Sequence, residues 1–547
     1  MSADPRSLAA GRIALALVLL LGLGKRLAEV ELWYSNTGLL PNHTVLWRPP
    51  VERVFSIFFP ASHADEAAFL MVLCGVAHLA LLVGYRTRLA HIASLIAILS
   101  LNGRLWFLVN GGDVVLAELT LWTAFLPTGR RFSVDSLRER LRRANERSPD
   151  DLAARDAHAP DVRPVMSLAV LAITVQLALI YVFNVLNKGG PAWREGSVVH
   201  YVLHQDRLVT ALGEQLRGHM TLTLSRIMTW GALAIEIALP VAILSPIRVA
   251  AARRIAVALV VALHLGFALL INLGVFSLAM MAFAPNLIAA SDWDALGRWW
   301  SRRRRARTVV FDGGCGICFQ TVRMLARLDG GRHLTFIASD DRRRLPADLP
   351  DELLAWTIVV IDPETGRRFT RASAFAQILD SLPGGFLLAL AMRLPGIKQA
   401  AGWIYDLVAR NRTAISAALG MGACGVAPPV GRPGSPQVIP AVLSPLRSFV
   451  CSAAADLREV VVAILMIVSA SQIAMENAVL PASLRHIQAG WMARSWATCS
   501  FIRGGRCSPR TLRAAMRTST STPSLPTDAM SIRSARSPVL STPRPVP

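Results

Sequence analysis

Long apolar runs separated by basic segments limit what this chain can fold into. Eight runs approach the roughly 20 residues that a helix needs to cross a bilayer. They lie near residues 11–24, 66–85, 89–107, 113–127, 164–186, 221–245, 255–272 and 275–290, and a ninth lies near 460–479. This pattern predicts a multi-pass α-helical membrane bundle. Several runs are short, so one pair of them is also compatible with a re-entrant segment.

Composition favours a membrane protein over a soluble one. The 547 residues are 53% hydrophobic and 17% charged, whereas soluble domains carry about 25% charged residues. The formal net charge is +22, but the arginines stand between the apolar runs. We therefore predict a lipid bilayer as the partner and no nucleic acid. The length predicts two or more domains.

The basic segments predict an orientation. The first run is followed by Lys25 and Arg26 and lacks a small-residue cleavage site, which indicates an anchor rather than a removed signal peptide. With eight spans, the arginine-rich segments 128–163, 246–254 and 302–307 fall on one side of the membrane. The excess of positive charge assigns that side to the cytoplasm, in a protein of the cell (inner) membrane.

Four ionisable residues lie within the apolar runs: His78, Glu118, Glu236 and His264. Such groups are costly in lipid unless they face a cavity or a partner. They either line a cavity in the bundle or make structural hydrogen bonds between helices. Their spacing does not suggest a metal site.

The fifth run ends in a polar segment that contains Asn184, Asn187 and Lys188, followed by a Gly-Gly-Pro turn and Trp193. A lysine at the end of an apolar helix commonly extends its ammonium to the membrane surface. Burial can also lower its pKa, which would let it act as a base.

The segment YVFNVLNK at 181–188, with Trp193 five residues beyond the lysine, resembles the HTTM family of bacterial relatives of vitamin K-dependent gamma-carboxylase. Residues 110–135 and 264–283 also match, and the resemblance covers about residues 5–295 and resumes near 455. It implies that Lys188 is the base in hydroquinone oxidation and that a quinone is a possible cofactor. Asp113 stands near a position where the carboxylase has a histidine. The predicted topology places Asp113 and Lys188 at the same outer face.

A pair of cysteines follows the arginine run. Residues 308–311 read as a strand, Asp312 begins a Gly-Gly turn, and Cys315 and Cys318 open a helix. A cysteine at a helix N-terminus has a stabilised thiolate, and one a turn later can resolve a mixed disulfide. The alternative is a structural zinc site, which needs about four ligands. Only Cys424 and His333 are further candidates, so we predict redox chemistry and no metal.

Strands at 333–338 and 356–362 and a helix at 372–381 complete a small α/β domain. The motif FDGGCGIC, with segments 359–379 and 405–424, resembles the DCC-type thiol-disulfide oxidoreductases of thioredoxin-like fold over about residues 307–427. The resemblance implies that Cys315 is the nucleophile and Cys318 the resolving thiol. The nearest candidate for a thioredoxin-type cis-proline is Pro350. The amphipathic segment 386–409 either packs on this domain or lies on the membrane.

The remaining sequence predicts a linker over 428–455, a final span over 456–490 and a disordered tail over 491–547. A second interpretation of the tail is a frameshift in the gene. Codons for the tail can be chosen such that translation in a shifted frame gives a sequence typical of an ordered segment. The other cysteines show no paired spacing: Cys74, Cys424, Cys451, Cys499 and Cys507.

The sequence therefore predicts an HTTM-like membrane domain over residues 1–295 joined to a thiol-disulfide oxidoreductase domain over 307–427. The cytoplasm keeps thiols reduced, so a disulfide there is expected to be transient and catalytic. The expected partner is a dithiol or disulfide protein or a small thiol, with coupling to a membrane quinone as a possibility. Two alternatives are a carboxylase-like or quinol-oxidising membrane enzyme whose reductant the thiol domain recycles, and a non-catalytic scaffold.

Overall fold

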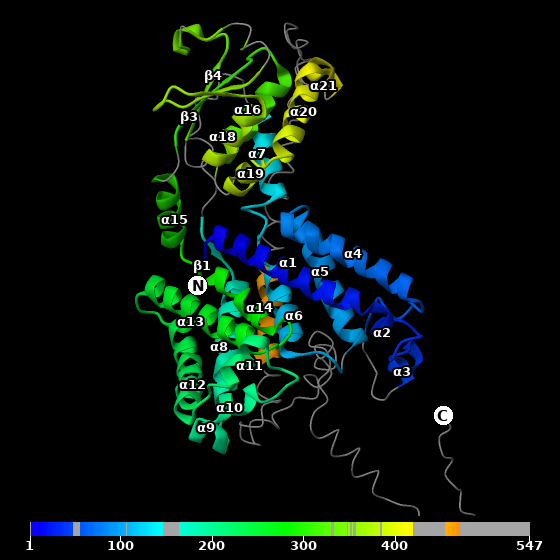
Figure 1. Cartoon of the computed structure of the whole chain (residues 1–547). Helices are drawn as coiled ribbons and strands as arrows, with labels where there is room; N and C mark the ends of the chain where they lie inside the picture. The colour runs from blue at the N-terminus through cyan, green and yellow to red at the C-terminus, as the bar shows by residue number, and fades with distance from the viewer. Residues whose placement is uncertain are drawn as a thin grey trace, which may run out of the picture. The chain divides into compact units, whose positions relative to one another are not determined.

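The computed structural model describes residues 2–47, 55–105, 107–145, 163–302, 305–329, 333–346, 348–350, 353, 357–382, 385–418 and 455–470. These residues form a helical part, which extends to residue 302 and includes 455–470, and an α/β part over 305–418. The chain is mostly helical with one small mixed sheet, as the sequence predicts (Figure 1).

Five helices of the first part are long and apolar enough to cross a membrane: α1 (Pro5–Ala28), α4 (Ala64–Val83), α8 (Leu168–Leu186), α12 (Leu222–Leu244) and α13 (Val249–Leu270). The other spans predicted within residues 1–295 are helical but do not combine the length and the apolar composition of these five. These are α5 (Thr87–Arg104), α6 (Gly111–Ala124), and α14 (Phe276–Met281) with the 3₁₀ helix η3 (Ala284–Leu287). Five of the predicted spans are thus supported, and the total of eight stays a prediction.

Shorter helices connect the apolar ones. They are α2 (Val30–Tyr34), α3 (Asn42–Trp47), α7 (Val134–Asn145), α9 (Pro191–Glu195), α10 (Val198–Leu203), α11 (Ala211–Arg217) and α15 (Ala290–Arg302). A two-residue strand β1 (Ser2–Ala3) pairs antiparallel with β2 (Val165–Met166).

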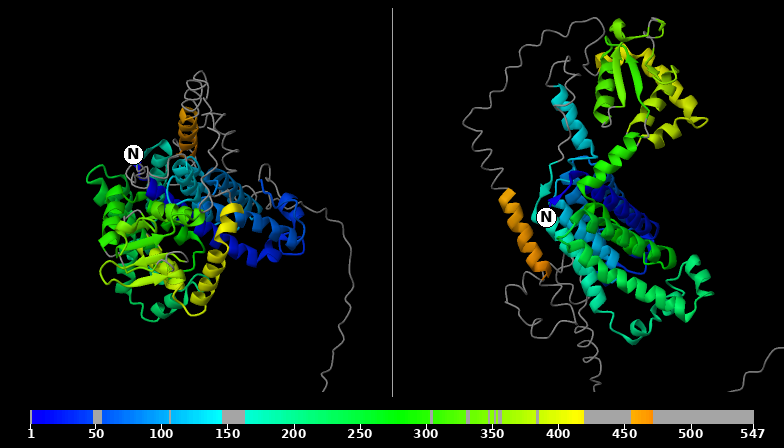
Figure 2. Two further views of the ribbon diagram at one scale, coloured as in Figure 1. Left: turned by 90° about the horizontal axis from the view of Figure 1, so that it is seen from above. Right: turned by 90° about the vertical axis from the view of Figure 1, so that its left-hand side faces the viewer.

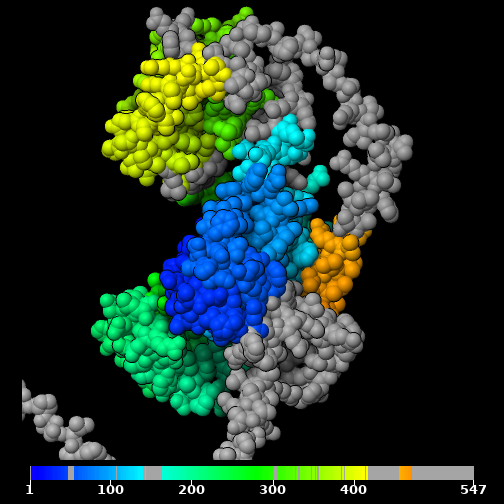
Figure 3. Space-filling view, turned by 90° about the vertical axis from the view of Figure 1, so that its right-hand side faces the viewer, coloured from blue at the N-terminus to red at the C-terminus, as the bar shows by residue number. Residues whose placement is uncertain are grey.

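The bundle has an apolar interior and an apolar exterior. Helix α1 packs against α4 and α6, and α12 packs against α8 and α13. Leu15, Leu119 and Leu177 are among the residues of the shared core and are fully buried. Side chains on the outer face of α4, such as Phe69 and Val76, are exposed. Figure 3 shows the surface of this N-terminal part of the bundle in blue. An apolar outer surface is the expected composition of a lipid-facing helix.

A helix over residues 455–470 packs on the same bundle (orange in Figure 2). Val462 belongs to the bundle core. The Glu459 carboxylate accepts hydrogen bonds from the Ser167 hydroxyl, at 2.9 Å, and the Leu168 backbone N–H, at 2.8 Å. Because Ser167 is the N-cap of α8, Glu459 adds a negative charge at the positive end of that helix.

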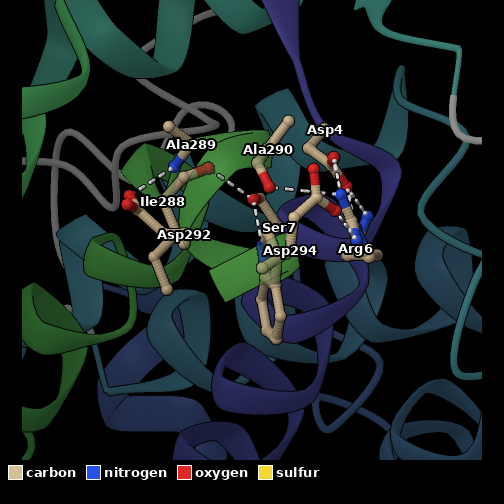
Figure 4. A network of polar contacts seen from close by, with 9 residues as sticks. Asp4, Arg6, Ser7, Ile288, Ala289, Ala290, Asp292 and Asp294 are labelled. Atoms are coloured by element: carbon tan, nitrogen blue, oxygen red, sulfur yellow. Dashed lines mark hydrogen bonds and ion pairs between the residues drawn. The ribbon is translucent and has the colours of Figure 1, made fainter. Parts of the chain in front are cut away.

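Contacts place the ends of several distant segments together. The Ser7 hydroxyl donates to the Ile288 carbonyl at 2.6 Å, and Arg6 forms an ion pair with Asp294 at 2.7 Å (Figure 4). Arg254 pairs with Asp292 at 2.5 Å. The start of α1, the start of α13 and the start of α15 therefore meet at one end of the bundle.

The segment that precedes α7 lies at that same end. The Arg12 guanidinium of α1 donates to the Phe132 carbonyl at 2.6 Å. Asp135 accepts from the Thr87 backbone N–H at 2.7 Å. One end of the bundle thus contains two of the three arginine-rich segments and α15, the helix from which the third segment continues. The topology predicted from the sequence requires these segments to share one end.

Each of the four ionisable residues predicted within apolar runs bonds to a neighbouring helix. The interhelical interpretation is therefore the one that the contacts support. The pairs are His78 with Ser94, Glu118 with Gln176, Glu236 with Asn184, and His264 with Tyr181.

The α/β part has a four-stranded sheet in the order β4-β3-β5-β6. Its strands are β3 (Arg307–Phe311), β4 (Leu334–Ala338), β5 (Val359–Ile361) and β6 (Arg368–Thr370). Strand β3 is parallel to β4 and antiparallel to β5, and β6 is antiparallel to β5. Helix α16 (Gly316–Leu328) connects the parallel pair, and α18 (Arg371–Ser381) follows β6. The predicted α/β arrangement is confirmed, and β6 is a strand that the sequence analysis missed.

The central strand is buried on both faces. Val309 packs in a core with Val360, Ala374 and Ile378, and Val310 packs with Val359 in a second core. A short strand with apolar residues on consecutive positions is typical of this environment. The turn that carries the cysteines therefore follows directly after a strand that is packed on both faces.

Three further helices follow α18: α19 (Phe386–Ala391), α20 (Ile397–Arg410) and α21 (Arg412–Ala418). Helix α20 packs on α18, and the Tyr405 hydroxyl accepts a hydrogen bond from the Ile358 backbone at 3.0 Å. Trp403 and Leu407 of the same helix stay exposed. One face of the amphipathic segment thus packs on the domain. The linker up to residue 454, residues 471–490 of the final span and the tail lie outside the described residues, as do Cys424, Cys451, Cys499 and Cys507.

Candidate functional site

The cysteine pair lies at the junction of β3 and α16. The Asp312 side chain accepts a hydrogen bond from the Gly314 backbone N–H at 3.0 Å, which closes the turn after the strand. A side chain at Gly313 would require the Asp340 carboxylate to shift, because a Cβ there would lie 2.8 Å from its oxygen. Cys315 is the N-cap residue of α16. The Phe319 N–H donates to the Cys315 carbonyl at 2.9 Å, which begins the helix.

The two sulfur atoms are in contact. The Cys318 thiol donates a hydrogen bond to the Cys315 sulfur, with the Sγ atoms 2.7 Å apart. Residues three apart lie on the same face of a helix, so the spacing of the motif produces this contact. The structure thus brings together the two sulfurs that the sequence singled out.

The contact separates the acidities of the two thiols. Donation from the Cys318 thiol lowers the pKa of Cys315 to about 6, with help from the Cys318 backbone N–H and the Arg412 cation and against the effect of burial. The same hydrogen bond raises the pKa of Cys318, and burial raises it further. The pair therefore carries one thiolate at neutral pH, and that thiolate is on Cys315.

Helix α21 supplies contacts that the sequence analysis did not identify. Arg412 forms an ion pair with Asp312 at 3.1 Å, and the Ser416 hydroxyl accepts from the Ile317 backbone N–H at 3.2 Å. Ile317 is in the first turn of α16, where backbone donors lack helical partners. Both residues fall within 405–424, a segment of the DCC-type resemblance, but nothing local in that segment indicates these contacts.

A cavity of about 480 Å³ adjoins the pair. Cys318 forms part of its wall, and apolar side chains such as Phe311, Ile358 and Ile404 form most of the rest. The cavity is also lined by Thr357, whose hydroxyl lies 2.9 Å from that of Tyr405. Its volume lies in the range of small-molecule sites.

The two cysteine residues differ in exposure. Cys315 is 1% exposed and does not line the cavity, whereas Cys318 is half-buried and does. The roles of nucleophile and resolving thiol that the resemblance implies for Cys315 and Cys318 stay predictions. Pro350 is absent from the residues that line the cavity, and Thr357 and Ile358 precede β5 there instead.

The described residues contain no group of three or more His, Cys, Asp or Glu side chains that could hold a metal ion. Cys424, one of the further ligands considered for a zinc site, lies outside them.

The second predicted site residue, Lys188, is held in an ion pair. Its ammonium contacts the Glu236 carboxylate of α12, which is 1% exposed, and lies 4.7 Å from the centre of the Trp193 ring. Asn184 donates to the other Glu236 oxygen at 2.8 Å. The lysine side chain is 14% exposed, so its ammonium binds a buried carboxylate rather than extending into solvent.

Asp113 belongs to a different cluster. Its carboxylate pairs with Arg26 at 2.7 Å and accepts from the Asn110 backbone N–H at 3.1 Å. The described contacts therefore do not join Asp113 to Lys188, and the shared site proposed for them stays a prediction.

A first prediction concerns the Cys315 thiolate. In the reduced protein, the ultraviolet absorbance of the thiolate is expected to appear with a midpoint at about pH 6. Cys318→Ala removes the thiol donor and is expected to move the midpoint upward, and Arg412→Ala should move it upward by less. Subtraction of the Cys315→Ser titration isolates this group from the other cysteines. A midpoint at about pH 8.5 in the native protein would contradict the assignment.

A second prediction concerns the Lys188–Glu236 pair. Lys188→Ala leaves a buried carboxylate without its cation, which is expected to destabilise the protein by about 3–5 kcal/mol. Lys188→Met combined with Glu236→Leu should restore most of the loss, because no charge is then buried. Denaturation in detergent measures the free energy of unfolding of both variants. Equal stability of the native protein and Lys188→Ala would show that the pair contributes nothing.

The same position allows a test of the base role that the HTTM resemblance implies. Arginine keeps the cation beside Glu236 but does not release its proton. If Lys188 is a base, Lys188→Arg loses quinol turnover while it keeps its stability. Unchanged turnover in this variant would exclude the catalytic role.

Comparison with known proteins gives one result for the thiol site. Residues 309–418 match the model of the DCC1-like thiol-disulfide oxidoreductase family. The comparisons with curated proteins and with solved structures gave no match. The matched segment runs from β3 through α21 and so contains the cysteine pair, the cavity wall and the Arg412 contact. The chain thus carries a DCC1-like thiol-disulfide oxidoreductase domain.

Proposed function

We propose that the protein is a membrane-anchored thiol-disulfide oxidoreductase whose redox centre is Cys315 and Cys318. The observation that carries this proposal is the contact between the two sulfurs at the N-terminus of α16, with the thiolate on Cys315. A low-pKa thiolate beside a second thiol is the arrangement that dithiol–disulfide exchange needs. The family match over residues 309–418 supports the same chemistry.

The geometry favours this function over a non-catalytic scaffold. A purely structural cysteine is usually inert, because burial raises its pKa and keeps it protonated. Cys315 has a lowered pKa despite its burial, through a thiol donor, a backbone donor and a nearby arginine. The adjoining cavity offers a place for a reaction partner.

Coupling to a membrane quinone stays a prediction from the sequence. The cavity beside Cys318 is apolar, but the described residues include no contact that favours a quinone over other apolar molecules. The carboxylase-like alternative likewise depends on Lys188 acting as a base, and in the structure the Lys188 ammonium is held in an ion pair with Glu236.

We also propose that the thiol domain lies on the cytoplasmic side of the cell membrane. Two arginine-rich segments and the helix that leads into the third meet at one end of the bundle. Basic residues at the ends of membrane helices favour the cytoplasmic side. The thiol domain follows directly after the third of these segments.

A third prediction tests the redox centre. Full-length protein in detergent is expected to catalyse exchange with a chromogenic aromatic disulfide, and Cys315→Ser and Cys318→Ser should each fall to the uncatalysed rate. Cys74→Ser is the control, because Cys74 is buried in α4 and belongs to another core. Full activity in either motif variant would contradict the proposal.

A fourth prediction tests the orientation. A cysteine introduced at the exposed Lys398 of α20, as Lys398→Cys, should react with a membrane-impermeant maleimide only after spheroplasts are permeabilised. Asp206→Cys, in the exposed connection between α10 and α11, should react in intact spheroplasts. Labelling of Lys398→Cys before permeabilisation would place the thiol domain on the outer side.

A further inference from the structure

Helix α20 exposes an apolar face of the thiol domain. Exposed apolar side chains recur along this helix at spacings of three, four and seven residues, which places them on one side. We call this side the α20 face, and its residues are Ile397, Trp403, Ile404, Leu407 and Val408. Trp403 is 69% exposed. A contiguous apolar surface of this kind marks a site of interaction with a protein or a membrane.

The other side of α20 attaches the helix to the domain. The Tyr405 ring lies 6.0 Å from the Phe375 ring of α18, and its hydroxyl accepts a hydrogen bond from the Ile358 backbone N–H at 3.0 Å. Asp406 forms an ion pair with Arg371 at the start of α18. The helix is therefore held in place, and the α20 face is the side that the domain leaves uncovered.

The exposed charges on α20 are positive. Lys398 and Arg410 are exposed, and the only acidic residue in the helix, Asp406, is paired with Arg371. Arg410 follows Trp403 by seven residues and so lies on the same side of the helix. An apolar face that contains a tryptophan and has basic residues at its edges is typical of a helix that lies in the interface of an anionic bilayer.

The chain keeps the thiol domain close to a membrane. Helix α15 has 13 residues and so is about 20 Å long. Ion pairs of Asp292 and Asp294 join its start to the end of the bundle. From Arg302 at the end of α15 to Arg307 at the start of β3, the chain spans at most about 18 Å. The thiol domain therefore begins within roughly 40 Å of the bundle end, a distance at which the surrounding bilayer is within its reach.

We propose that the α20 face lies on the anionic surface of the bilayer that the helical part of the same chain spans. The proposal rests on the membrane anchoring proposed above, and it depends neither on the redox centre nor on the side of the membrane. A second copy of the chain is a poorer occupant, because a two-fold contact through this face would bring the basic edges of two copies together.

The α20 face is continuous with the thiol site. Ile404 and Val408 belong to this face and also to the wall of the cavity that Cys318 lines. A bilayer on the α20 face therefore borders this cavity. Docking in this way holds the redox centre beside the membrane, whether its substrate is dissolved in lipid or in water.

The first arm of the test measures contact with lipid. Full-length protein carries Trp403→Cys labelled with bimane, and its native cysteines other than the buried Cys74 are replaced by serine. One copy per nanodisc is reconstituted in phosphatidylcholine and phosphatidylglycerol, with ordinary or brominated acyl chains. We expect brominated lipid to lower the bimane emission at least about twofold, because an interfacial helix buries its apolar face at the acyl chains. Equal emission in the two lipids would overturn the proposal.

The matched control is Glu364→Cys, in the exposed turn between β5 and β6. Its bimane should be quenched by aqueous iodide and not by brominated lipid, and the label on Trp403→Cys should show the opposite. If the label on Trp403→Cys resists both quenchers, another segment of the chain covers the face and the proposal is wrong. Protection from iodide that appears only with two copies per disc would assign the face to a second copy instead.

The second arm changes the face itself. In the labelled Trp403→Cys protein, Leu407→Asp places a charge in the face and should abolish quenching by brominated lipid, whereas Leu407→Met keeps the face apolar and should keep the quenching. Leu407 is exposed, so both variants are expected to fold, which circular dichroism checks. Undiminished quenching in Leu407→Asp would contradict the α20 face as the surface in contact.

The third arm varies the lipid charge. Discs of phosphatidylcholine alone should quench the label on Trp403→Cys less than discs that contain phosphatidylglycerol, because Lys398 and Arg410 then have no anionic headgroups to attract them. Added salt should reduce the difference between the two lipids. Quenching that does not depend on lipid charge would overturn the assignment of an anionic surface.

These outcomes are separable from those that test the proposed function. If brominated lipid does not quench the label while Cys315→Ser and Cys318→Ser lose activity, the redox centre stands and only the docking face is wrong. If the protein does not enter nanodiscs at all, the membrane anchoring itself is wrong.

Discussion

An ionisable side chain inside an apolar helix needs a partner, and this constraint orders the helical part of the chain. Three such pairs involve α8: Gln176 with Glu118 of α6, Tyr181 with His264 of α13, and Asn184 with Glu236 of α12. Water is absent from the bilayer interior, so each polar group depends on this partner for its hydrogen bond. Helix α8 is therefore tied to three neighbours, and Lys188 just beyond it completes the Glu236 cluster.

The thiol site depends on a more local arrangement. Two cysteines three residues apart at the start of a helix lie within contact distance in any helix that begins there, and the free backbone donors stabilise a thiolate. The fold holds the turn in place, because the turn follows directly after β3, which is buried on both faces. Helix α21 then adds the Arg412 cation and the Ser416 hydroxyl from about a hundred residues further along the chain.

The sequence predicted features that depend on neighbouring residues. The strand, the turn and the helix around Cys315 follow from a β-branched run, Asp-Gly-Gly and a helical apolar repeat, and the structure contains all three. Strand β6 was missed, because Arg368 to Thr370 is short and half-polar and is a strand only by pairing with β5. The apolar runs predicted helices correctly, and five of these helices are long and apolar enough to cross a membrane.

The sequence by itself determined that a thiol pair stands at a strand-to-helix junction, and that helices apolar enough to cross a membrane precede it in the chain. Both features depend on short-range spacing and on the length of apolar runs. Only the tertiary structure decided that Cys318 lines a cavity, because part of the cavity wall comes from helices that return to the site late in the chain. It likewise decided that Lys188 is paired rather than free, since the buried carboxylate of Glu236 lies 48 residues away in sequence. Long-range packing sets the burial of a group and its electrostatic partner, and those two quantities control the chemistry of both sites.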